Sequence, residues 1–179
     1  TKQTVEGERF NIYAAVGEPR VVFSTHTDTV SPYFPFSQDE EYIYGRGACD
    51  TKGIIAAMLK AAEELLKTGT RDFGLLFVVG EEGPSDGAKA ANTIPNHCRW
   101  LINGEPTENR MAVGSKGTVR AKLTVTGRAC HSAYPEMGES AIDKLLDVLS
   151  DVRAIQWPEH ELLGKATCNI GLIEGGVQP

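Results

Sequence analysis

The chain has 179 residues, of which 41% are hydrophobic and 23% charged, and its formal net charge at neutral pH is −6. This composition supports a folded core and excludes a disordered chain. An acidic chain without basic runs argues against nucleic acid as a partner. No stretch approaches the roughly 18 consecutive apolar residues that a membrane span needs, so we also expect no membrane partner.

The cysteines are far apart in the sequence and show no zinc-finger spacing: Cys49, Cys98, Cys130 and Cys168. We expect free thiols in a reducing compartment. The N-terminus lacks the pattern of a secretion signal, in which charged residues precede an apolar run. The cysteine spacing and the missing signal pattern together predict a cytoplasmic protein. Residue 1 is not Met, and the sequence stops on the turn signal of LIEGGVQP, so we expect a fragment of a longer enzyme.

Three apolar runs predict strands in the first part of the chain: RVVFST (20–25), FGLLFVV (73–79) and the shorter RWLIN (99–103). The first two runs suit strands that are buried on both faces, as in parallel sheets, and the third is a shorter candidate strand. Apolar residues at helical spacing predict a helix over 50–67, with Gly69 just past its end, and a second helix is expected within 84–93. This alternation of strands and helices predicts an α/β layer fold.

The pattern changes in the last third of the chain. TVRAKLTVTG (118–127) alternates apolar and polar residues, which is typical of a half-buried strand in an antiparallel sheet. A helix is expected over 139–152 and a further strand over 165–173. The sequence therefore predicts a second module of strand–helix–strand type, with domains at 1–112 and 113–179.

Polar residues with metal-binding chemistry follow each predicted strand of the first part. His26 and Asp28 follow the first strand, Glu81 and Glu82 the second, and Glu105, which can also be a turn residue, the third. In open α/β sheets, sites form beyond the carboxyl ends of the strands. One His with several carboxylates and no thiolate suits a catalytic divalent metal such as zinc, manganese or cobalt.

Each of these residues also has a structural explanation. His26 and Asp28 can be a surface His and a turn Asp. They also share one side of an extended segment, so the carboxylate can accept from the ring and leave its other nitrogen free for a metal. Asp50 can cap the helix that begins there. Glu81 and Glu82 can be solvated acids, but adjacent carboxylates after an apolar run favour a cation or a shared proton.

Five motifs in this order resemble those of the M20 family of metallohydrolases, which includes acetylornithine deacetylase, succinyl-diaminopimelate desuccinylase, aminoacylases and carboxypeptidase G2. HTDTV, GRGACDTKG, GEEG and NGEPT are similar to its metal-site motifs, and GRACHSAYPEMGESAI is similar to the start of its dimerisation, or lid, domain. The resemblance implies a mostly parallel catalytic sheet domain, here partial. The first half of an α+β ferredoxin-like lid domain would follow it.

The resemblance also implies roles for single residues. The implied ligands of two divalent ions, most often zinc, with cobalt or manganese as alternatives, are His26, Asp50, Glu82 and Glu105. Asp50 would bridge the two ions and be followed by a cis peptide bond to Thr51. Asp28 would orient His26, and Glu81 would be the general base. His131 would contact the substrate or the oxyanion across a homodimer formed through the lid domain; without the resemblance it is an ordinary loop His.

The sequence departs from the family pattern at two points. Gly80 stands where the family often has Asp, and we expect this to matter little because that position is not a ligand. The second metal normally takes a further His from near the C-terminus, and neither His97 nor His160 lies in a matching context. We therefore expect the isolated chain to be inactive or to bind the second metal weakly.

The implied reaction is metal-dependent hydrolysis of the amide bond of an N-acyl amino acid, in the manner of acetylornithine deacetylase. A metal-bridged water would attack, and Glu81 would move its proton to the leaving amine. Two alternatives stay open. One is a metallopeptidase of the same family, a carboxypeptidase or dipeptidase, with a peptide as substrate. The other is a binding module that has lost its activity.

Overall fold

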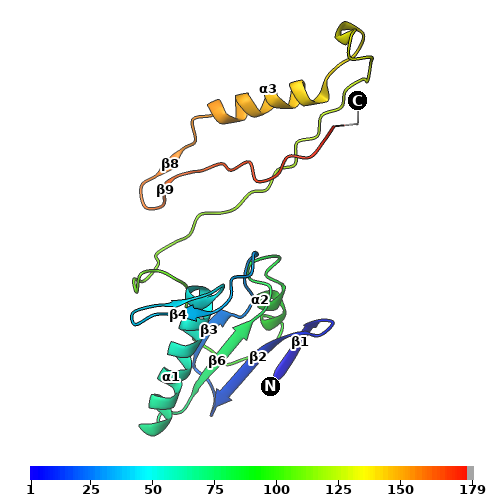
Figure 1. Cartoon of the computed structure of the whole chain (residues 1–179). Coiled ribbons are helices and arrows are strands. Elements are labelled where there is room, and N and C mark those ends of the chain that lie inside the picture. The colour runs from blue at the N-terminus through cyan, green and yellow to red at the C-terminus, as the bar shows by residue number, and fades with distance from the viewer. Residues whose placement is uncertain (177–179) are drawn as a thin grey trace. The chain divides into compact units, whose positions relative to one another are not determined.

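The computed structural model describes residues 1–176 and divides the chain into two compact units, Thr1–Arg110 and Met111–Pro179. The first unit contains a five-stranded sheet with two helices, and the second contains one long helix with short flanking elements (Figure 1). Within the described residues, the four cysteines are free thiols, as predicted. No helix in this part of the chain has the length and apolar character needed to cross a membrane.

The sheet of the first unit has the strand order β1-β2-β6-β3-β7. The strands are β1 (Lys2–Glu6), β2 (Arg9–Val16), β3 (Val21–His26), β6 (Phe73–Val78) and β7 (Trp100–Asn103). β3 pairs in parallel with both β6 and β7, whereas β2 runs antiparallel to β1 and β6. The three strands predicted from apolar runs are therefore confirmed as β3, β6 and β7, with the parallel pairing expected of them. The hairpin β1–β2 adds an antiparallel edge that no apolar run predicts.

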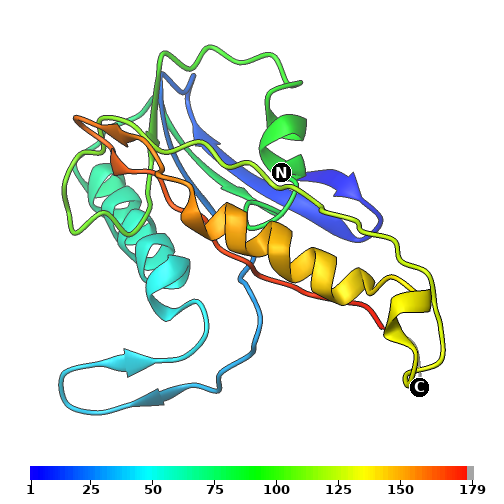
Figure 2. The same cartoon turned by 90° about the horizontal axis from the view of Figure 1, so that it is seen from above.

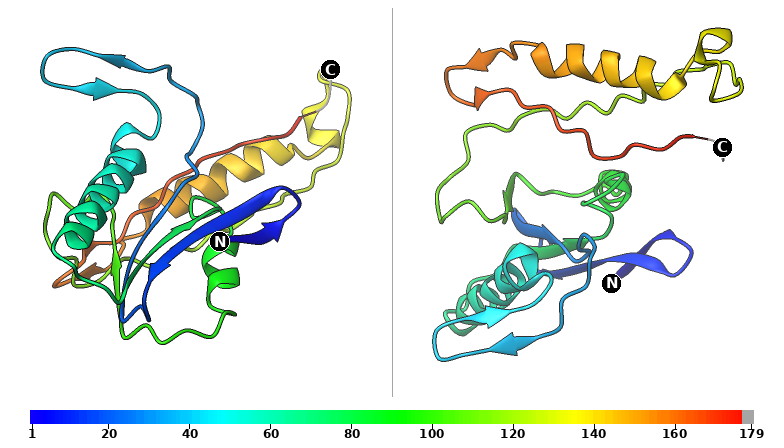
Figure 3. Two further views of the ribbon diagram at one scale, coloured as in Figure 1. Left: turned by 90° about the horizontal axis from the view of Figure 1, so that it is seen from below. Right: turned by 45° about the horizontal axis from the view of Figure 1, so that its top comes forward.

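Two helices cover opposite faces of this sheet (Figures 2 and 3). They are α1 (Ile54–Lys67) and α2 (Asp86–Ala91). α1 ends as predicted, since Gly69 just beyond it has φ 78°, a left-handed conformation that favours glycine. It begins later than predicted, because the preceding residues form a separate tight turn, Ala48–Gly53.

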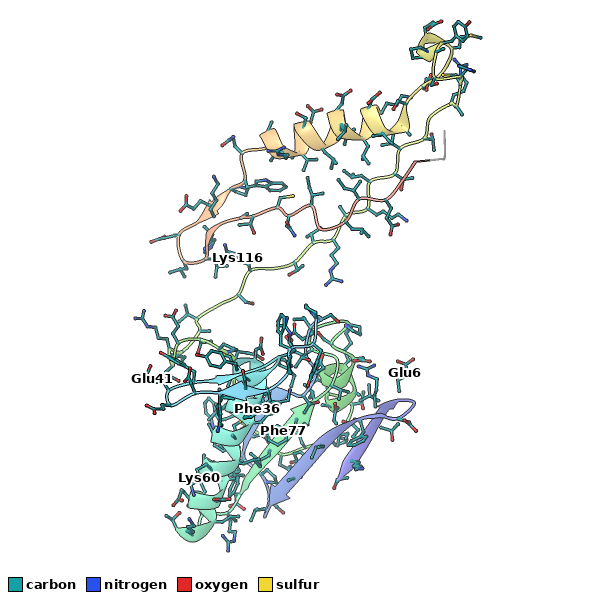
Figure 4. All side chains as sticks on the ribbon, in the orientation of Figure 1. Glu6, Phe36, Glu41, Lys60, Phe77 and Lys116 are labelled. Carbon is teal, nitrogen blue, oxygen red and sulfur yellow. The ribbon has the colours of Figure 1, made fainter. Side chains whose placement is uncertain are left out.

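The core of the first unit lies between β6 and α1. Alternate side chains of β6, Phe73, Leu75 and Phe77, are buried and pack in one cluster with Met58 and Ala62 of α1. Phe77 is labelled in Figure 4. Burial of side chains of this size stabilises a fold by roughly 1.5–3 kcal/mol each. This packing fixes where β6 ends, and therefore where the loop that follows it begins.

An exposed hairpin connects β3 to the turn before α1. It consists of β4 (Ser37–Gln38) and β5 (Ile43–Tyr44), which pair antiparallel. Asp39 accepts a hydrogen bond from the backbone N–H of Glu41 at 2.8 Å, which closes its tip. Phe36, labelled with Glu41 in Figure 4, has 68% of its surface exposed.

The second unit is built around the predicted helix, which is present as α3 (Ala141–Ala154). Ser140 caps it by accepting a hydrogen bond from the backbone N–H of Asp143 at 3.1 Å, as a serine before a helix is expected to do. The other elements of this unit are η2 (Pro135–Met137), β8 (Glu159–His160) and β9 (Gly164–Lys165).

The prediction of two strands in this unit is wrong. Residues 118–127 form no regular strand, and of 165–173 only Lys165 belongs to one, the short β9. Val119 and Leu123, which the alternation puts on the apolar side of a half-buried strand, are 94% and 46% exposed. An alternating pattern specifies which side chains would face a core, but a strand also needs a partner for its backbone groups. Within the described residues of this unit, the segment 118–127 has none.

An ion pair joins β2 to the first turn of α2. Arg9 donates to both carboxylate oxygens of Asp86, at 2.6 and 3.0 Å. Such two-point contacts between a guanidinium and a carboxylate are well oriented. The hydrogen bond from Arg9 is the main reason why the pKa of Asp86 lies below its ordinary value.

We expect this ion pair to stabilise the fold above about pH 4 and to stop doing so at lower pH. The folded pKa of Asp86 is depressed, so its contribution is present above the unfolded value of about 3.9 and is lost as the pH falls through the folded pKa. Urea unfolding of the wild type and Arg9→Met should show midpoints that differ more at about pH 7 than at about pH 2. An equal difference at both pH values would mean that Arg9 acts through packing alone.

Candidate metal centre

Five side chains that can bind a metal meet at one edge of the first unit. His26 ends β3, Glu81 and Glu82 follow β6, Glu105 follows β7, and Asp50 lies in the turn before α1. They form two groups that share the imidazole, His26 with Asp50 and Glu105, and His26 with Glu81 and Glu82. In each group the ligand atoms lie within 4.8 Å of one another. The structure thus brings together all the predicted metal ligands and the predicted general base.

The ring of His26 is the buried centre of this cluster, with 1% of its surface exposed. Its Nε2 lies 2.9 Å from Oδ1 of Asp50, 3.8 Å from Glu105 and 3.9 Å from Glu81. Burial lowers the pKa of His26, but the hydrogen bonds to Asp50 and to the backbone of Asp28, together with the nearby carboxylates, outweigh it and raise the pKa above its ordinary value. The surrounding carboxylates therefore favour the positively charged form of the imidazole.

A backbone carbonyl fixes the protonation of the other ring nitrogen. Nδ1 of His26 lies 2.9 Å from the carbonyl oxygen of Asp28. A carbonyl only accepts hydrogen bonds, so Nδ1 carries the proton and the neutral ring leaves Nε2 free as a ligand. The sequence predicted this role for the Asp28 carboxylate, but that group lies 3.6 Å from Nδ1.

The Asp28 carboxylate instead holds the loop that follows β6. Its two oxygens accept hydrogen bonds from the backbone N–H groups of Glu81 and Glu82, each at 3.1 Å. Asp28 therefore connects the two halves of the cluster. Its carbonyl orients the imidazole, and its side chain orients the backbone of the two glutamates.

Asp50 does not cap α1, which corrects the structural explanation given above. The N-cap residue of α1 is Gly53, and Asp50 has φ −111° and ψ 93°, outside the helical range. The predicted cis peptide bond between Asp50 and Thr51 is present. In this turn the Asp50 side chain hydrogen-bonds His26 and remains 48% exposed, so it can also face a ligand.

Two buried threonines connect the backbone segments that carry His26, Asp50 and Glu105. The hydroxyls of Thr25 and Thr51 lie 2.9 Å apart, and Thr25 donates to the carbonyl of Gly104 at 2.8 Å. Thr51 also lies 3.1 Å from the carbonyl of His26. The two hydroxyls have only two protons for these three contacts. Thr25 can donate to Gly104 while Thr51 donates to Thr25, and the alternative for Thr51 is to donate to the carbonyl of His26.

The cluster carries more negative charge than its own residues neutralise. Burial is the main reason why the pKa of Glu105 is raised, and the nearby charges of Glu81 and Asp50 raise it further. A hydrogen bond from Asn103 and the charge of His26 lower this pKa but do not outweigh the other causes. Within residues 1–176, no Lys or Arg forms an ion pair with any of the four clustered carboxylates. One imidazole and four carboxylate donors fit a divalent cation of the zinc, cobalt or manganese type.

His131, the remaining predicted site residue, lies in the second unit. Its Nδ1 accepts a hydrogen bond from the backbone N–H of Ala133 at 3.1 Å, and its ring centre lies 5.8 Å from that of Tyr134. These local contacts account for its orientation. Its contact with a substrate stays a prediction.

The model of peptidase family M20/M25/M40 matches residues 22–177. The chain belongs to this family. It is 44% identical over 175 residues to an M20 domain-containing protein of Schizosaccharomyces pombe, covering 94% of this chain and 44% of that protein. It is 39% identical over 205 residues to a probable carboxypeptidase of Talaromyces marneffei, covering 96% of this chain and 46% of that protein.

One solved structure has a similar fold. The aminopeptidase PepT of Bacillus cereus superposes with a TM-score of 0.55 at 23% identity, over 95% of this chain and 48% of that one. At this identity the likeness shows the fold alone. The chain thus spans about half the length of the curated relatives it matches.

One departure from the M20 pattern has a structural reason. Gly80 has φ 72°, and a Cβ atom at this position would collide with the carboxylate of Asp86. The space next to Gly80 is thus taken by the Arg9–Asp86 ion pair. An Asp at position 80 would have to displace the side-chain ends of this pair, and the expectation that glycine here matters little for the metal site stays a prediction.

We expect Asp28→Ala to release the loop after β6 that carries Glu81 and Glu82, called the glutamate loop below, without changing the tautomer of His26. The mutation removes the acceptors for the N–H groups of Glu81 and Glu82 but leaves the carbonyl that faces Nδ1. In metal-free protein at about pH 8, the NMR signal of the His26 Nδ1 proton should persist while amide exchange at residues 81 and 82 speeds up. Loss of that proton signal with unchanged exchange would assign the tautomer to the carboxylate instead.

We expect Thr25→Val to cost roughly 1–3 kcal/mol in unfolding free energy, because it removes the donor to the Gly104 carbonyl and leaves the buried Thr51 hydroxyl with the carbonyl of His26 as its remaining partner. Urea unfolding measures the loss. Thr93→Val is the control, since its hydroxyl bonds an exposed helix end, and should change stability by less than about 0.5 kcal/mol. Equal effects of the two mutations would contradict the assigned role of the threonine pair.

Proposed function

We propose that the protein carrying this chain is a metal-dependent hydrolase that cleaves amide bonds in peptides. The observation that carries the proposal is the convergence of His26, Asp50, Glu81, Glu82 and Glu105 at the carboxyl end of the sheet. Membership of peptidase family M20/M25/M40 supports it. So do relatives described as probable carboxypeptidases, among them one from Aspergillus flavus at 40% identity over 200 residues.

We infer two divalent ions at this cluster, for which zinc is the first choice and cobalt or manganese the alternatives. His26 and Glu105 would hold one ion, Glu82 the other, and Asp50 would bridge them. Bound there, such ions would lower the pKa of a water molecule and polarise the substrate carbonyl.

Glu81 is the residue we assign as general base. Its carboxylate is 46% exposed and lies at the edge of the donor cluster, 3.9 Å from Nε2 of His26, so it can reach both solvent and substrate. The backbone N–H of Glu81 is anchored by Asp28, which fixes where the side chain starts. From this position Glu81 would take the proton of the attacking water and deliver it to the leaving amine.

Hydrolysis of N-acyl amino acids, the reaction first inferred from the sequence, uses the same donor set and stays a second candidate. The peptidase fits at least as well, because the relatives at 36–40% identity are described as probable carboxypeptidases. A binding module without activity is the third possibility. The convergence of one imidazole and four carboxylates argues against it, since unneutralised carboxylates around a buried ring are costly unless a cation binds.

For the second unit, we propose the first half of a ferredoxin-like lid domain. It would bring His131 to the substrate and form a homodimer with a second copy. The helix α3 with its flanking chain would be the part of such a domain that the described residues contain. Cross-linking and mass measurement of the full-length protein would test the dimer.

Two isosteric mutations separate the roles assigned to the adjacent glutamates. In the full-length protein, Glu81→Gln should keep its bound metal and lose roughly 10²–10⁴-fold in kcat, because only proton transfer is removed. Glu82→Gln should lose one equivalent of metal, measured by elemental analysis after dialysis. If Glu81→Gln instead loses metal and Glu82→Gln keeps it, the two roles are exchanged.

A substrate panel decides between the candidate functions. Metal-loaded full-length protein would be assayed with dipeptides, longer peptides, acetylornithine, succinyl-diaminopimelate and N-acetyl amino acids. We expect the highest kcat/KM for a peptide. Higher kcat/KM for an N-acyl amino acid would favour the deacylase, and metal binding without any turnover would favour the binding module.

A further inference from the structure

The strand β2 carries an amide side chain that is wholly buried. Asn11 has 0% of its surface exposed, although asparagine is disfavoured inside strands. A buried amide costs free energy unless its hydrogen-bonding groups are paired. The partners of Asn11 therefore indicate why this residue stands there.

Two of its partners are the backbone groups at either end of the glutamate loop. The side-chain oxygen of Asn11 accepts a hydrogen bond from the N–H of Val79 at 3.1 Å. Its NH₂ group donates to the carbonyl of Gly87 at 2.8 Å, and also to the side chain of Gln3 at 2.9 Å. One side chain thus spans the chain from the residue after β6 to the first turn of α2, and Glu81 and Glu82 lie between those anchors.

The two ends of the loop approach each other closely at this point. The N–H of Gly87 donates to the carbonyl of Val79 at 3.1 Å. A Cβ atom on Gly87 would collide with the backbone of Val79 and come within 2.7 Å of the Asn11 oxygen. The space between Val79 and Asn11 therefore accommodates only a glycine at position 87. The close approach of the two loop ends is specified by shape as well as by hydrogen bonds.

The neighbouring contacts hold the same loop from other sides. Arg9, two residues before Asn11 and therefore on the same face of β2, pairs with Asp86 next to Gly87. Asp28 holds the middle of the loop from β3 through the backbone N–H groups of the glutamates. Asn11 differs from these in that it joins the two ends of the loop directly.

We propose that Asn11 is a positioning residue that sets the Glu81–Glu82 loop in the geometry needed to bind a divalent cation and move a proton. The inference rests on the proposed function in that it takes the two glutamates to be the base and a ligand. Partners that orient the ligands of a metal commonly affect its affinity by 10–100-fold when they are removed. Asn11 would exert this effect from β2, without touching metal or substrate.

The test uses full-length protein and two substitutions of the amide. Asn11→Ser leaves room for water and buries no charge. Asn11→Asp keeps the shape and the acceptor but sets a carboxylate against the carbonyl of Gly87. For both, we expect faster hydrogen exchange over residues 79–87 in metal-free protein, zinc affinity lowered by roughly tenfold or more in titrations, and a lower kcat with KM within about twofold.

Gln3→Leu is the matched control. It removes the third partner of Asn11 and the hydrogen bond from Gln3 to the carbonyl of Ala90, but leaves both contacts with the loop. We expect it to lower global stability while exchange over 79–87, zinc affinity and kcat stay as in the wild type.

Two outcomes are decisive. If the Asn11 variants lose only global stability, as Gln3→Leu does, and keep wild-type exchange over 79–87 and wild-type zinc affinity, Asn11 is merely structural and the proposal is overturned. If wild-type protein binds no divalent metal and cleaves no substrate, the proposed function fails, and so does a positioning role towards it. Exchange over 79–87 then still reports separately whether Asn11 fixes the loop.

Discussion

Mutual repulsion among the carboxylates around His26 is the constraint that the first unit has to accommodate. Asp50, Glu81 and Glu105 each have an oxygen within 4 Å of the same buried ring nitrogen. Without a cation these groups would separate if their backbones were free to move, because like charges this close disfavour ionisation of one another. Hydrogen bonds to the backbone that carries the two glutamates therefore help to set these positions, together with the contacts of the Asp50 carboxylate with His26 and of the Glu105 carboxylate with Asn103.

Each of the two donor groups has its own hydrogen-bonded support. The Thr25–Thr51 pair connects the segments of His26, Asp50 and Glu105, while Asp28 and Asn11 fix the loop of the two glutamates. Both supports consist of neutral or singly charged groups, and among the described residues no buried side-chain N or O atom lacks a hydrogen-bond partner, which makes buried polar networks rigid. Such rigidity lets the fold present several negative groups to one point before a cation arrives.

The sequence predicted the donors of this site but not what holds them. Apolar runs locate β3, β6 and β7, and the residues after parallel strands must meet at one edge, so His26, Glu81 and Glu105 follow from the pattern. Asn11 could not be assigned in this way, because its partners depend on β2 pairing with β6. Nor does spacing distinguish the carbonyl of Asp28 from its carboxylate, since both lie near the ring.

The second unit shows the opposite case, where a clear pattern does not produce the expected element. Residues 118–127 alternate well, yet they form no ladder, whereas α3 forms where its pattern predicts. A helix satisfies its backbone groups within itself, so its pattern and its cap at Ser140 suffice. A strand depends on another segment to pair its backbone N–H and C=O groups. An alternating pattern indicates only which side of the strand would be buried. Local patterns therefore predict the helix of this unit, while its strands depend on a partner that the pattern does not name.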